Sequence, residues 1–144
     1  ITPRLKMTSN STQEKRLTID SRIEELQAVE RFVDELHEEH NFKADVYGNI
    51  LVAVTEAVNN AILHGNDGDV NKKVELTARL KSTYLLQIEV KDQGTGFNYQ
   101  SVKDPTAPEN LLNEHGRGVF VMEHLADTIS FVDPGNIVRM EFNI

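Results

Sequence analysis

The stretch TEAVNNAILHGN, from Thr55 to Asn66, combines a core-forming helix pattern with polar residues that a buried helix rarely holds. Its Ala, Val, Ile and Leu residues suit a buried segment. Glu56 and Asn60 are four residues apart and so share one helix face, and His64 follows one turn later. An unpaired buried carboxylate is unfavourable. We therefore expect this row to face a wet cleft or a bound ion, or else to be the solvent-facing side of an amphipathic helix.

The chemistry of the row favours a catalytic use if it lies in a cleft. The carboxylate of Glu56 can polarise a hydroxyl or a water molecule as a general base. The amide oxygen of Asn60 is a hard ligand that suits Mg²⁺. This ion usually keeps several water ligands and is also coordinated by the phosphates of the substrate. We expect structural roles for Asn59, one position round the helix, and for His64 near the helix end.

The whole chain has the size and composition of one domain. It holds 144 residues, 39% of them hydrophobic, which is enough to build a core. Polar residues interrupt its apolar stretches within a few positions, so we expect no membrane-spanning segment and no membrane partner. The chain has no cysteine, which excludes disulfides, thiolate catalysis and thiolate metal sites and fits a cytoplasmic location.

The net charge of the chain indicates which classes of partner to expect. The formal charge is -8, from 23 acidic and 15 basic side chains. Duplex nucleic-acid binders normally present a basic face, and no cluster of Lys and Arg stands out here, so we expect no direct nucleic-acid partner. The acidity fits solubility, and it also fits a protein partner with a basic surface.

The N-terminal half is expected to form a strand followed by two helices. Residues 1–15 are polar and aperiodic, which is typical of an arm, and 16–20 can form a short strand. SRIE, from Ser21 to Glu24, has the spacing of a capping box and predicts a helix from there to about Glu38. A second helix is predicted over 45–64, with Gly65 ending it in the left-handed conformation.

The C-terminal half is expected to form two hairpins around one helix. Alternating apolar residues predict strands at 73–81 and 85–92, joined by a short link at Ser82 and Thr83. A helix is predicted at 118–127, followed by a hairpin of strands 128–132 and 137–144. This order favours an α+β fold, a two-layer sandwich in which helices cover one face of a mostly antiparallel, mixed sheet. We expect a single domain over 16–144.

Two glycine-rich motifs follow the first strand pair. DQGTGF, from Asp92 to Phe97, places a carboxylate at a strand end, where it can accept a hydrogen bond from an exocyclic amine such as that of adenine. HGRGV, from His115 to Val119, precedes a predicted helix, so its free amides and Arg117 could hold a phosphate. Turn chemistry alone would explain the first motif and a hinge the second. The polar segment 93–116 is long enough to be a lid or binding loop, or a merely flexible loop.

Together the three motifs supply a base with a metal ligand, an adenine acceptor and a phosphate site. EAVNNAILHGN, DQGTGF and GRGVFVMEHLAD resemble the N box and the two glycine boxes of the GHKL ATPase superfamily, which includes gyrase B, MutL and histidine-kinase catalytic domains. Within it the motifs resemble those of the bacterial anti-sigma factor serine/threonine kinases. The resemblance covers the chain from about Lys15 to Ile144, and it implies the Bergerat fold of histidine-kinase-like ATPases.

The resemblance implies ATP and Mg²⁺ as cofactors and assigns a role to each matching residue. Glu56 matches the catalytic general base, Asn60 the ligand of Mg²⁺, and Asp92 the acceptor of the adenine amine. The remaining nucleotide-binding candidates come from the two glycine boxes: Gly94, Gly96, Gly116, Arg117 and Gly118. The segment from about 98 to 115 matches the ATP lid.

The implied function is that of an ATP-dependent serine/threonine protein kinase and anti-sigma regulatory factor. Its expected partners are an anti-sigma factor antagonist, which it phosphorylates, a sigma factor and a second copy of itself in a homodimer. One position departs from the family, because Glu114 stands where the best-known kinases carry an Arg two residues before the second glycine box. The alternatives are a nucleotide-dependent binding module without kinase activity and a histidine-kinase-like ATPase core that works beside another chain.

Overall fold

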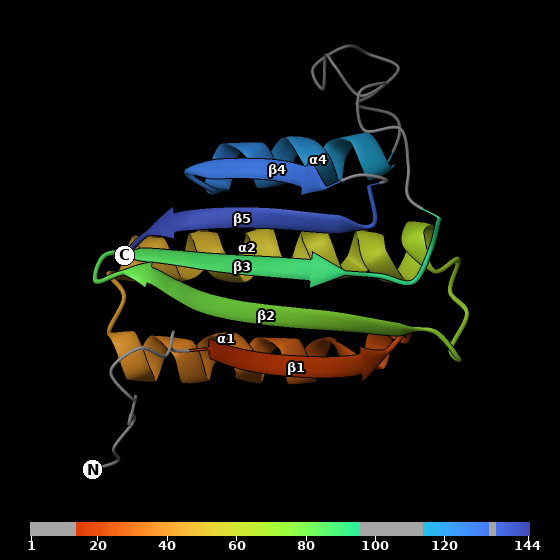
Figure 1. Ribbon diagram of the computed structural model, residues 1–144, viewed down its shortest axis with the longest axis horizontal. Coiled ribbons are helices and arrows are strands. Elements are labelled where there is room, and N and C mark those ends of the chain that lie inside the picture. The colour runs from red at the N-terminus through yellow and green to blue at the C-terminus, as the bar shows by residue number, and fades with distance from the viewer. Residues whose placement is uncertain (1–13, 96–113, 133–134) are drawn as a thin grey trace.

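A computed structural model describes residues 14–95, 114–132 and 135–144. The elements run in the following order along the chain (Figure 1): β1 (Glu14–Asp20), the 3₁₀ turn η1 (Ile23–Glu25), α1 (Leu26–His40), α2 (Ala44–Asn60), the π-helical turn η2 (Ala61–Gly65), β2 (Lys73–Ser82), β3 (Leu85–Lys91), α4 (Glu114–Leu125), β4 (Thr128–Val132) and β5 (Ile137–Asn143).

The five described strands form one sheet in the order β1-β2-β3-β5-β4, and every pairing between them is antiparallel. The described helices α1, α2 and α4 lie behind the sheet in Figure 1, with α2 contacting both α1 and α4. The predicted α+β sandwich with helices on one face is therefore confirmed. The prediction of a partly mixed sheet is wrong for the described strands, because all four pairings are antiparallel, including those of β1 with β2 and of β3 with β5, which are separated by helices along the chain.

The core lies between the sheet and the helices. Strands β2, β3 and β5 each turn alternate apolar residues toward the helices, and the sequence pattern predicted this alternation for β2 and β3. Helix α2 buries Ile50, Val54 and Val58 on these strands. Because α2 packs so tightly against β3 and β5, the positions of its last two turns relative to the end of β3 are fixed.

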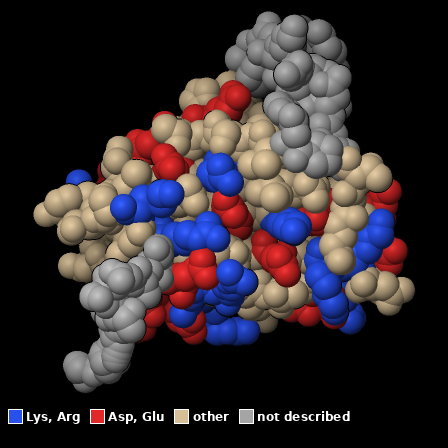
Figure 2. Space-filling model, in the orientation of Figure 1, with Lys and Arg blue, Asp and Glu red and all other residues tan. Residues whose placement is uncertain are grey.

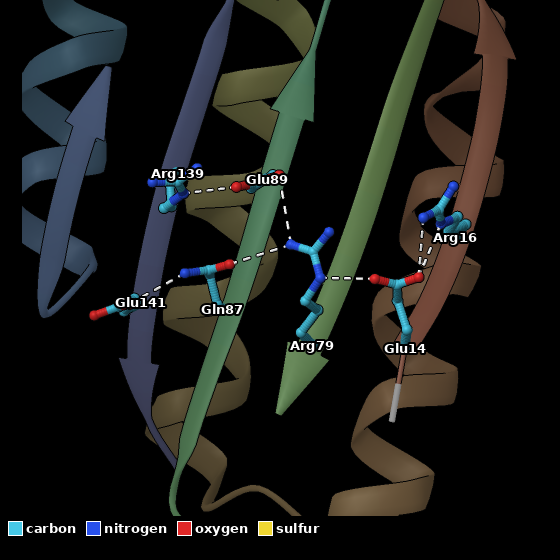
Figure 3. A network of polar contacts seen from close by, with 7 residues as sticks. All are labelled: Glu14, Arg16, Arg79, Gln87, Glu89, Arg139 and Glu141. Carbon is cyan, nitrogen blue, oxygen red and sulfur yellow. Dashed lines mark hydrogen bonds and ion pairs between the residues drawn. The ribbon is translucent and has the colours of Figure 1, made fainter. Parts of the chain in front are cut away.

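The other face of the sheet is covered with charged side chains of both signs (Figure 2). A chain of contacts crosses four strands there (Figure 3): Arg79 pairs with Glu14 at 2.6 Å and with Glu89 at 3.6 Å, and Arg139 pairs with Glu89 at 2.6 Å. Ion pairs that are partly exposed contribute at most about 1 kcal/mol each. Their main effect is to favour the observed strand register over a shifted one.

The segment that contains helix α2 contradicts the prediction that no part of the chain is long and apolar enough to span a membrane. Together with η2, helix α2 forms a 22-residue helical segment, Ala44–Gly65, that is long and apolar enough by composition to cross a membrane. The expectation that no segment has this property was therefore wrong. In the fold this segment packs between α1, α4 and the sheet, which is the position of a core helix.

Three local predictions about element ends also need correction. Ser21 does not cap a helix: its hydroxyl is buried and donates to the Lys72 carbonyl oxygen at 2.8 Å. Gly65 does not adopt the left-handed conformation, which occurs instead at Asp67 and Gly68 with φ of 54° and 68°. Strand β1 begins at Glu14, so the predicted arm is shorter than 15 residues, and residues 1–13 lie outside the described part.

Helix α4 begins four residues earlier than predicted, at Glu114 rather than at residue 118. The second glycine motif therefore lies inside the helix instead of before it. A helix leaves only its first amides unpaired, so Gly118, the fifth residue of α4, is too far along to offer a free amide. The reason for a glycine at this position has to come from its neighbours in space.

Candidate functional site

Three elements that are distant in sequence meet at one end of the molecule. The C-terminal end of α2, the C-terminal end of β3 and the N-terminal end of α4 lie on the same side in Figure 1. Asp92 follows β3 directly, and Asn60 is the last residue of α2. The sequence candidates on these three elements are therefore brought to a common region.

Glu56 and Asn60 meet Gly118 of helix α4. A Cβ atom on Gly118 would lie 2.9 Å from Asn60 Nδ2, 3.2 Å from Asn60 Oδ1 and 3.2 Å from Glu56 Oε1. The shared face predicted for these two side chains thus points at the second glycine motif. Glycine leaves room for these two groups, whereas a larger residue would push the ends of the Asn60 and Glu56 side chains aside.

The side-chain amide of Asn60 is buried with an unsatisfied hydrogen-bond donor. Its Nδ2 atom is buried and has no hydrogen-bond partner, and within the described residues it is the one buried side-chain nitrogen or oxygen in that condition. Buried polar groups are normally paired, and an exception at a cleft is a common sign of a site that binds a ligand. Asn60 also lines the pocket described below.

Asp92 is buried at the end of β3, with 9% of its surface exposed. Its Oδ1 atom accepts a hydrogen bond from the Gly94 amide at 2.8 Å. The other side of the carboxylate lies against Gly65, where a Cβ atom would overlap it. Gly65, which the sequence analysis assigned to a helix cap, is thus the residue that makes room for the Asp92 carboxylate.

The surroundings of Asp92 disfavour its charged form. Burial raises the pKa of the Asp92 carboxyl above its ordinary value, while the Gly94 amide and the charge of Lys72 partly offset this effect. The folded state therefore holds the proton more tightly than the unfolded chain does. Consequently, this group lowers the stability of the protein as the pH rises from the ordinary pKa of about 3.8 through the raised value.

Replacement of Asp92 by asparagine should remove this pH-dependent cost. The amide keeps an oxygen for the Gly94 N–H but carries no charge. We expect Asp92→Asn to raise the free energy of unfolding at pH 7 by up to about 1 kcal/mol, the size of an ordinary point substitution. Near pH 3 the gain should vanish, because the wild-type carboxyl is then protonated in both the folded and the unfolded state.

Urea unfolding between pH 3 and pH 7 measures the difference in the free energy of unfolding. The exposed Glu75→Gln is the charge-matched control, and a gain for Asp92→Asn that is the same at pH 3 as at pH 7 would contradict the assignment.

A pocket that is partly open to solvent lies between α2, η2, α4 and the sheet. Its polar lining comes from Asn60, His64, Asp92 and Asn136, and its glycines are Gly65 and Gly135. The apolar lining is Ala57, Ala61, Val90, Met122, Phe131 and Val138. Such a cleft, with apolar walls and a few convergent polar groups, is typical of a site for a flat organic ligand.

Some sequence candidates cannot be placed in this site. Gly96 and nearly all of the predicted lid, 98–115, lie outside the described residues. Gly116 and Arg117 belong to helix α4. The Arg117 side chain lies outside the described part of the structure, so its predicted contact with a phosphate stays a prediction.

Sequence reasoning missed several residues that shape the pocket. Asn136 was assigned to a turn, yet its side-chain amide donates to the Asp92 carbonyl at 3.1 Å and its own carbonyl accepts from the Asp92 amide at 2.9 Å. Phe131 and Met122 were predicted only as parts of a strand and of a helix, yet both line the cavity. No local pattern distinguishes these residues from ordinary turn and core positions.

The site could hold a metal ion only together with a ligand. Within the described residues no group of three or more His, Cys, Asp or Glu side chains could bind a metal. Asn60 offers a single amide oxygen beside the Glu56 carboxylate. Mg²⁺ is often held by one or two protein oxygens while the phosphates of a nucleotide and waters complete its shell. The donor set therefore fits Mg²⁺ that arrives with a nucleotide.

This α+β sandwich with helices on one face of the sheet is the fold of histidine-kinase-like ATPase domains. Residues 19–142 match the histidine kinase-like ATPase domain, and the chain belongs to this family, which implies that it binds ATP. Similar proteins include the anti-sigma F factors of Bacillus thuringiensis (strain Al Hakam) and Bacillus mycoides (strain KBAB4). Each is 32% identical over 87 residues, which cover 58% of this chain and 58% of the relative.

A solved structure shows the same fold. The crystal structure of the RsbU and RsbW domains of Rv1364c from Mycobacterium tuberculosis resembles this chain with a TM-score of 0.66 and 18% sequence identity. The similarity covers 90% of this chain and 31% of that chain. At this identity the comparison shows the fold alone.

Proposed function

We propose that this protein is a cytoplasmic, ATP-dependent serine/threonine kinase and anti-sigma factor that phosphorylates an anti-sigma factor antagonist. In this proposal it acts as a homodimer that binds a sigma factor when the antagonist is phosphorylated. The names of the Bacillus relatives support the anti-sigma role. The observation that carries the kinase chemistry is the placement of Glu56 beside Asn60 and Gly118, next to the pocket that holds Asp92.

The proposed reaction uses each of these residues. Adenine enters the pocket, where the Asp92 carboxylate accepts a hydrogen bond from its exocyclic amine. The phosphates extend toward Asn60, whose amide oxygen would hold Mg²⁺, and the ion supplies charge that offsets the phosphate oxygens. Glu56 takes the proton of a serine or threonine hydroxyl. The oxygen then bonds to the γ-phosphorus while the bond to ADP breaks, and ADP leaves.

A phosphorylation assay tests this proposal directly. The protein is incubated with Mg-ATP and its cognate antagonist, and the antagonist is analysed for phosphoserine and phosphothreonine. Phosphorylated antagonist together with ADP supports the kinase. If the wild-type protein binds ATP but forms neither ADP nor phosphoprotein, the kinase proposal fails.

That outcome would favour a second function, a nucleotide-dependent binding module. Glu114, at the position where the best-known kinases of the family carry an Arg, is the observation that favours it. In that case ATP would change the affinity for a partner by a shift between conformations, without any chemical step.

Replacement of Gly118 by alanine should separate ATP binding from stability. The new methyl group would push against Asn60 and Glu56, so we expect affinity for Mg-ATP to fall roughly tenfold through loss of one hydrogen-bonded contact. Alanine inside a helix is favoured over glycine by about 1 kcal/mol, so the free energy of unfolding should stay the same or rise. Calorimetric titration with Mg-ATP and urea unfolding measure the two effects.

Gly48→Ala is the matched control for this substitution. Gly48 also lies inside a helix, α2, but no atom lies within 4 Å of a Cβ placed there. We expect the same helix stabilisation with unchanged ATP affinity. If Gly118→Ala binds Mg-ATP as tightly as Gly48→Ala does, then Asn60 and Glu56 do not face the nucleotide phosphates.

A further inference from the structure

The side chain of Asn66 connects the end of the N-box helix to the turn that carries Asp92. Asn66 is fully buried, and its Oδ1 atom accepts a hydrogen bond from the Gln93 amide at 2.8 Å. Its Nδ2 atom donates to Ser21 Oγ at 2.8 Å and to the Lys73 carbonyl at 3.0 Å. Both amide hydrogens and the oxygen of this side chain are therefore used.

Asn66 is itself held firmly. Its backbone amide donates to the Ala61 carbonyl at 2.8 Å, which closes the π-helical turn η2. Ser21, at the end of β1, also donates its hydroxyl to the Lys72 carbonyl at 2.8 Å. The Asn66 amide group is thus fixed from three directions, by η2, by the end of β1 and by the start of β2.

The peptide group between Asp92 and Gln93 is fixed at both ends by asparagine side chains. Asn66 binds its N–H, and Asn136 binds its carbonyl oxygen at 3.1 Å. A peptide group is planar, so these two bonds fix its plane. The Asp92 amide donates to the Asn136 carbonyl at 2.9 Å, which holds the preceding peptide group as well, and the two peptide groups together set the direction of the Asp92 Cα–Cβ bond. On the pocket side, the Asp92 carboxylate lies against Gly65, the residue directly before Asn66.

We propose that Asn66 is a positioning residue that sets the direction of the Asp92 carboxylate and thereby the preference of the site for a purine with an exocyclic amine. The inference rests on the proposed ATP site. Asn66 touches no ligand: it acts only through the Gln93 amide. Its loss should therefore weaken the contact with the amine and leave the contacts with the phosphates in place.

The test compares two nucleotides that differ only in the amine. ATP and purine riboside triphosphate, which lacks the exocyclic amine, are titrated calorimetrically with Mg²⁺ into the wild type and Asn66→Ala. We expect the wild type to prefer ATP. In Asn66→Ala the affinity for ATP should fall roughly tenfold, since a hydrogen bond to a charged group is misplaced, while that for purine riboside triphosphate changes less than about twofold.

A second single variant keeps the test decisive if Asn66→Ala folds poorly. Ser21→Ala removes one partner of Asn66 and leaves the bond to Gln93, so it should shift the ratio of the two affinities in the same direction but less. In an Asp92→Asn background, Asn66→Ala should change ATP affinity by less than about twofold, because the two substitutions act on one contact. Val33→Ala, a buried site in α1, is the destabilised control and should leave the ratio unchanged.

The possible outcomes separate this inference from the proposed function. A wild type that binds neither nucleotide would overturn the ATP site and the inference with it. A wild type that prefers ATP, with variants of Asn66 and Ser21 that lose both nucleotides equally, would overturn the positioning role alone. Loss of hydrogen-exchange protection at the Gln93 amide in Asn66→Ala, with the β1–β2 ladder still protected, would support it independently of any nucleotide.

Discussion

Replacement of Glu56 by glutamine is expected to slow phosphate transfer to the antagonist by roughly 10²–10⁴-fold, the usual contribution of a general base. Glutamine keeps the size and hydrogen-bonding oxygen of the side chain, so the contact with Gly118 remains. It cannot take the proton of the acceptor hydroxyl. Affinity for Mg-ATP should therefore stay within about twofold of the wild type, because one neutral hydrogen bond is worth little in net terms.

Single-turnover transfer of labelled γ-phosphate and calorimetric titration with Mg-ATP measure these two quantities. Glu38→Gln, an exposed position on α1, is the control for loss of one negative charge. Transfer at the wild-type rate in Glu56→Gln would exclude Glu56 as the base. A loss of ATP affinity as large as the loss of rate would make Glu56 a binding residue instead.

Structure could be predicted from the sequence wherever the residue pattern that determines it lies within one short segment. The alternation of Val74, Leu76 and Ala78 sufficed to predict strand β2 and its buried face, and a similar pattern predicted β3. The spacing of Glu56 and Asn60 predicted a common face, and both side chains do meet Gly118. Periodicity is a local property, so it can be read without knowledge of the fold.

The sequence was uninformative wherever the decisive contact joins distant segments. Asp92 lies against Gly65 and its peptide is bound by Asn66 and Asn136, yet nothing in the spacing of these residues connects them. Gly118 shows the same limit. Glycine disfavours helix, so GRG was predicted to precede α4, whereas a close contact with α2 favours glycine inside the helix.

The glycines of the site fall into two kinds, those that lie against the ends of movable side chains and those that lie against backbone or a buried carboxylate. Gly118 yields space to side chains, which can rotate away if a methyl group is added. Gly65 and Gly94 instead allow two backbone segments and a buried carboxylate to approach one another. Substitution at the first kind should change ligand binding more than stability, whereas substitution at the second kind should change both.

Gly94→Ala is accordingly expected to lower both the free energy of unfolding and the affinity for ATP. A Cβ atom there would overlap the Gly65 carbonyl oxygen and lie 2.8 Å from its carbon, and backbone atoms cannot rotate away as a side chain can. We expect a loss of about 1–3 kcal/mol in the free energy of unfolding, the usual cost of overpacking. The Gly94 amide, which binds Asp92 Oδ1, must shift as well, so ATP affinity should fall by roughly 10–100-fold, the worth of a charged hydrogen bond.

Gly68→Ala distinguishes this direct effect from destabilisation in general. Gly68 has a φ of 68° and open space around its Cβ position, so alanine there strains only the backbone, at a cost of about 1 kcal/mol. Under conditions where both variants are folded, Gly68→Ala should bind ATP like the wild type and Gly94→Ala should not. Equal ATP affinities in the two variants would mean that the close approach of Gly94 to Gly65 serves the fold alone, and that Asp92 does not depend on it.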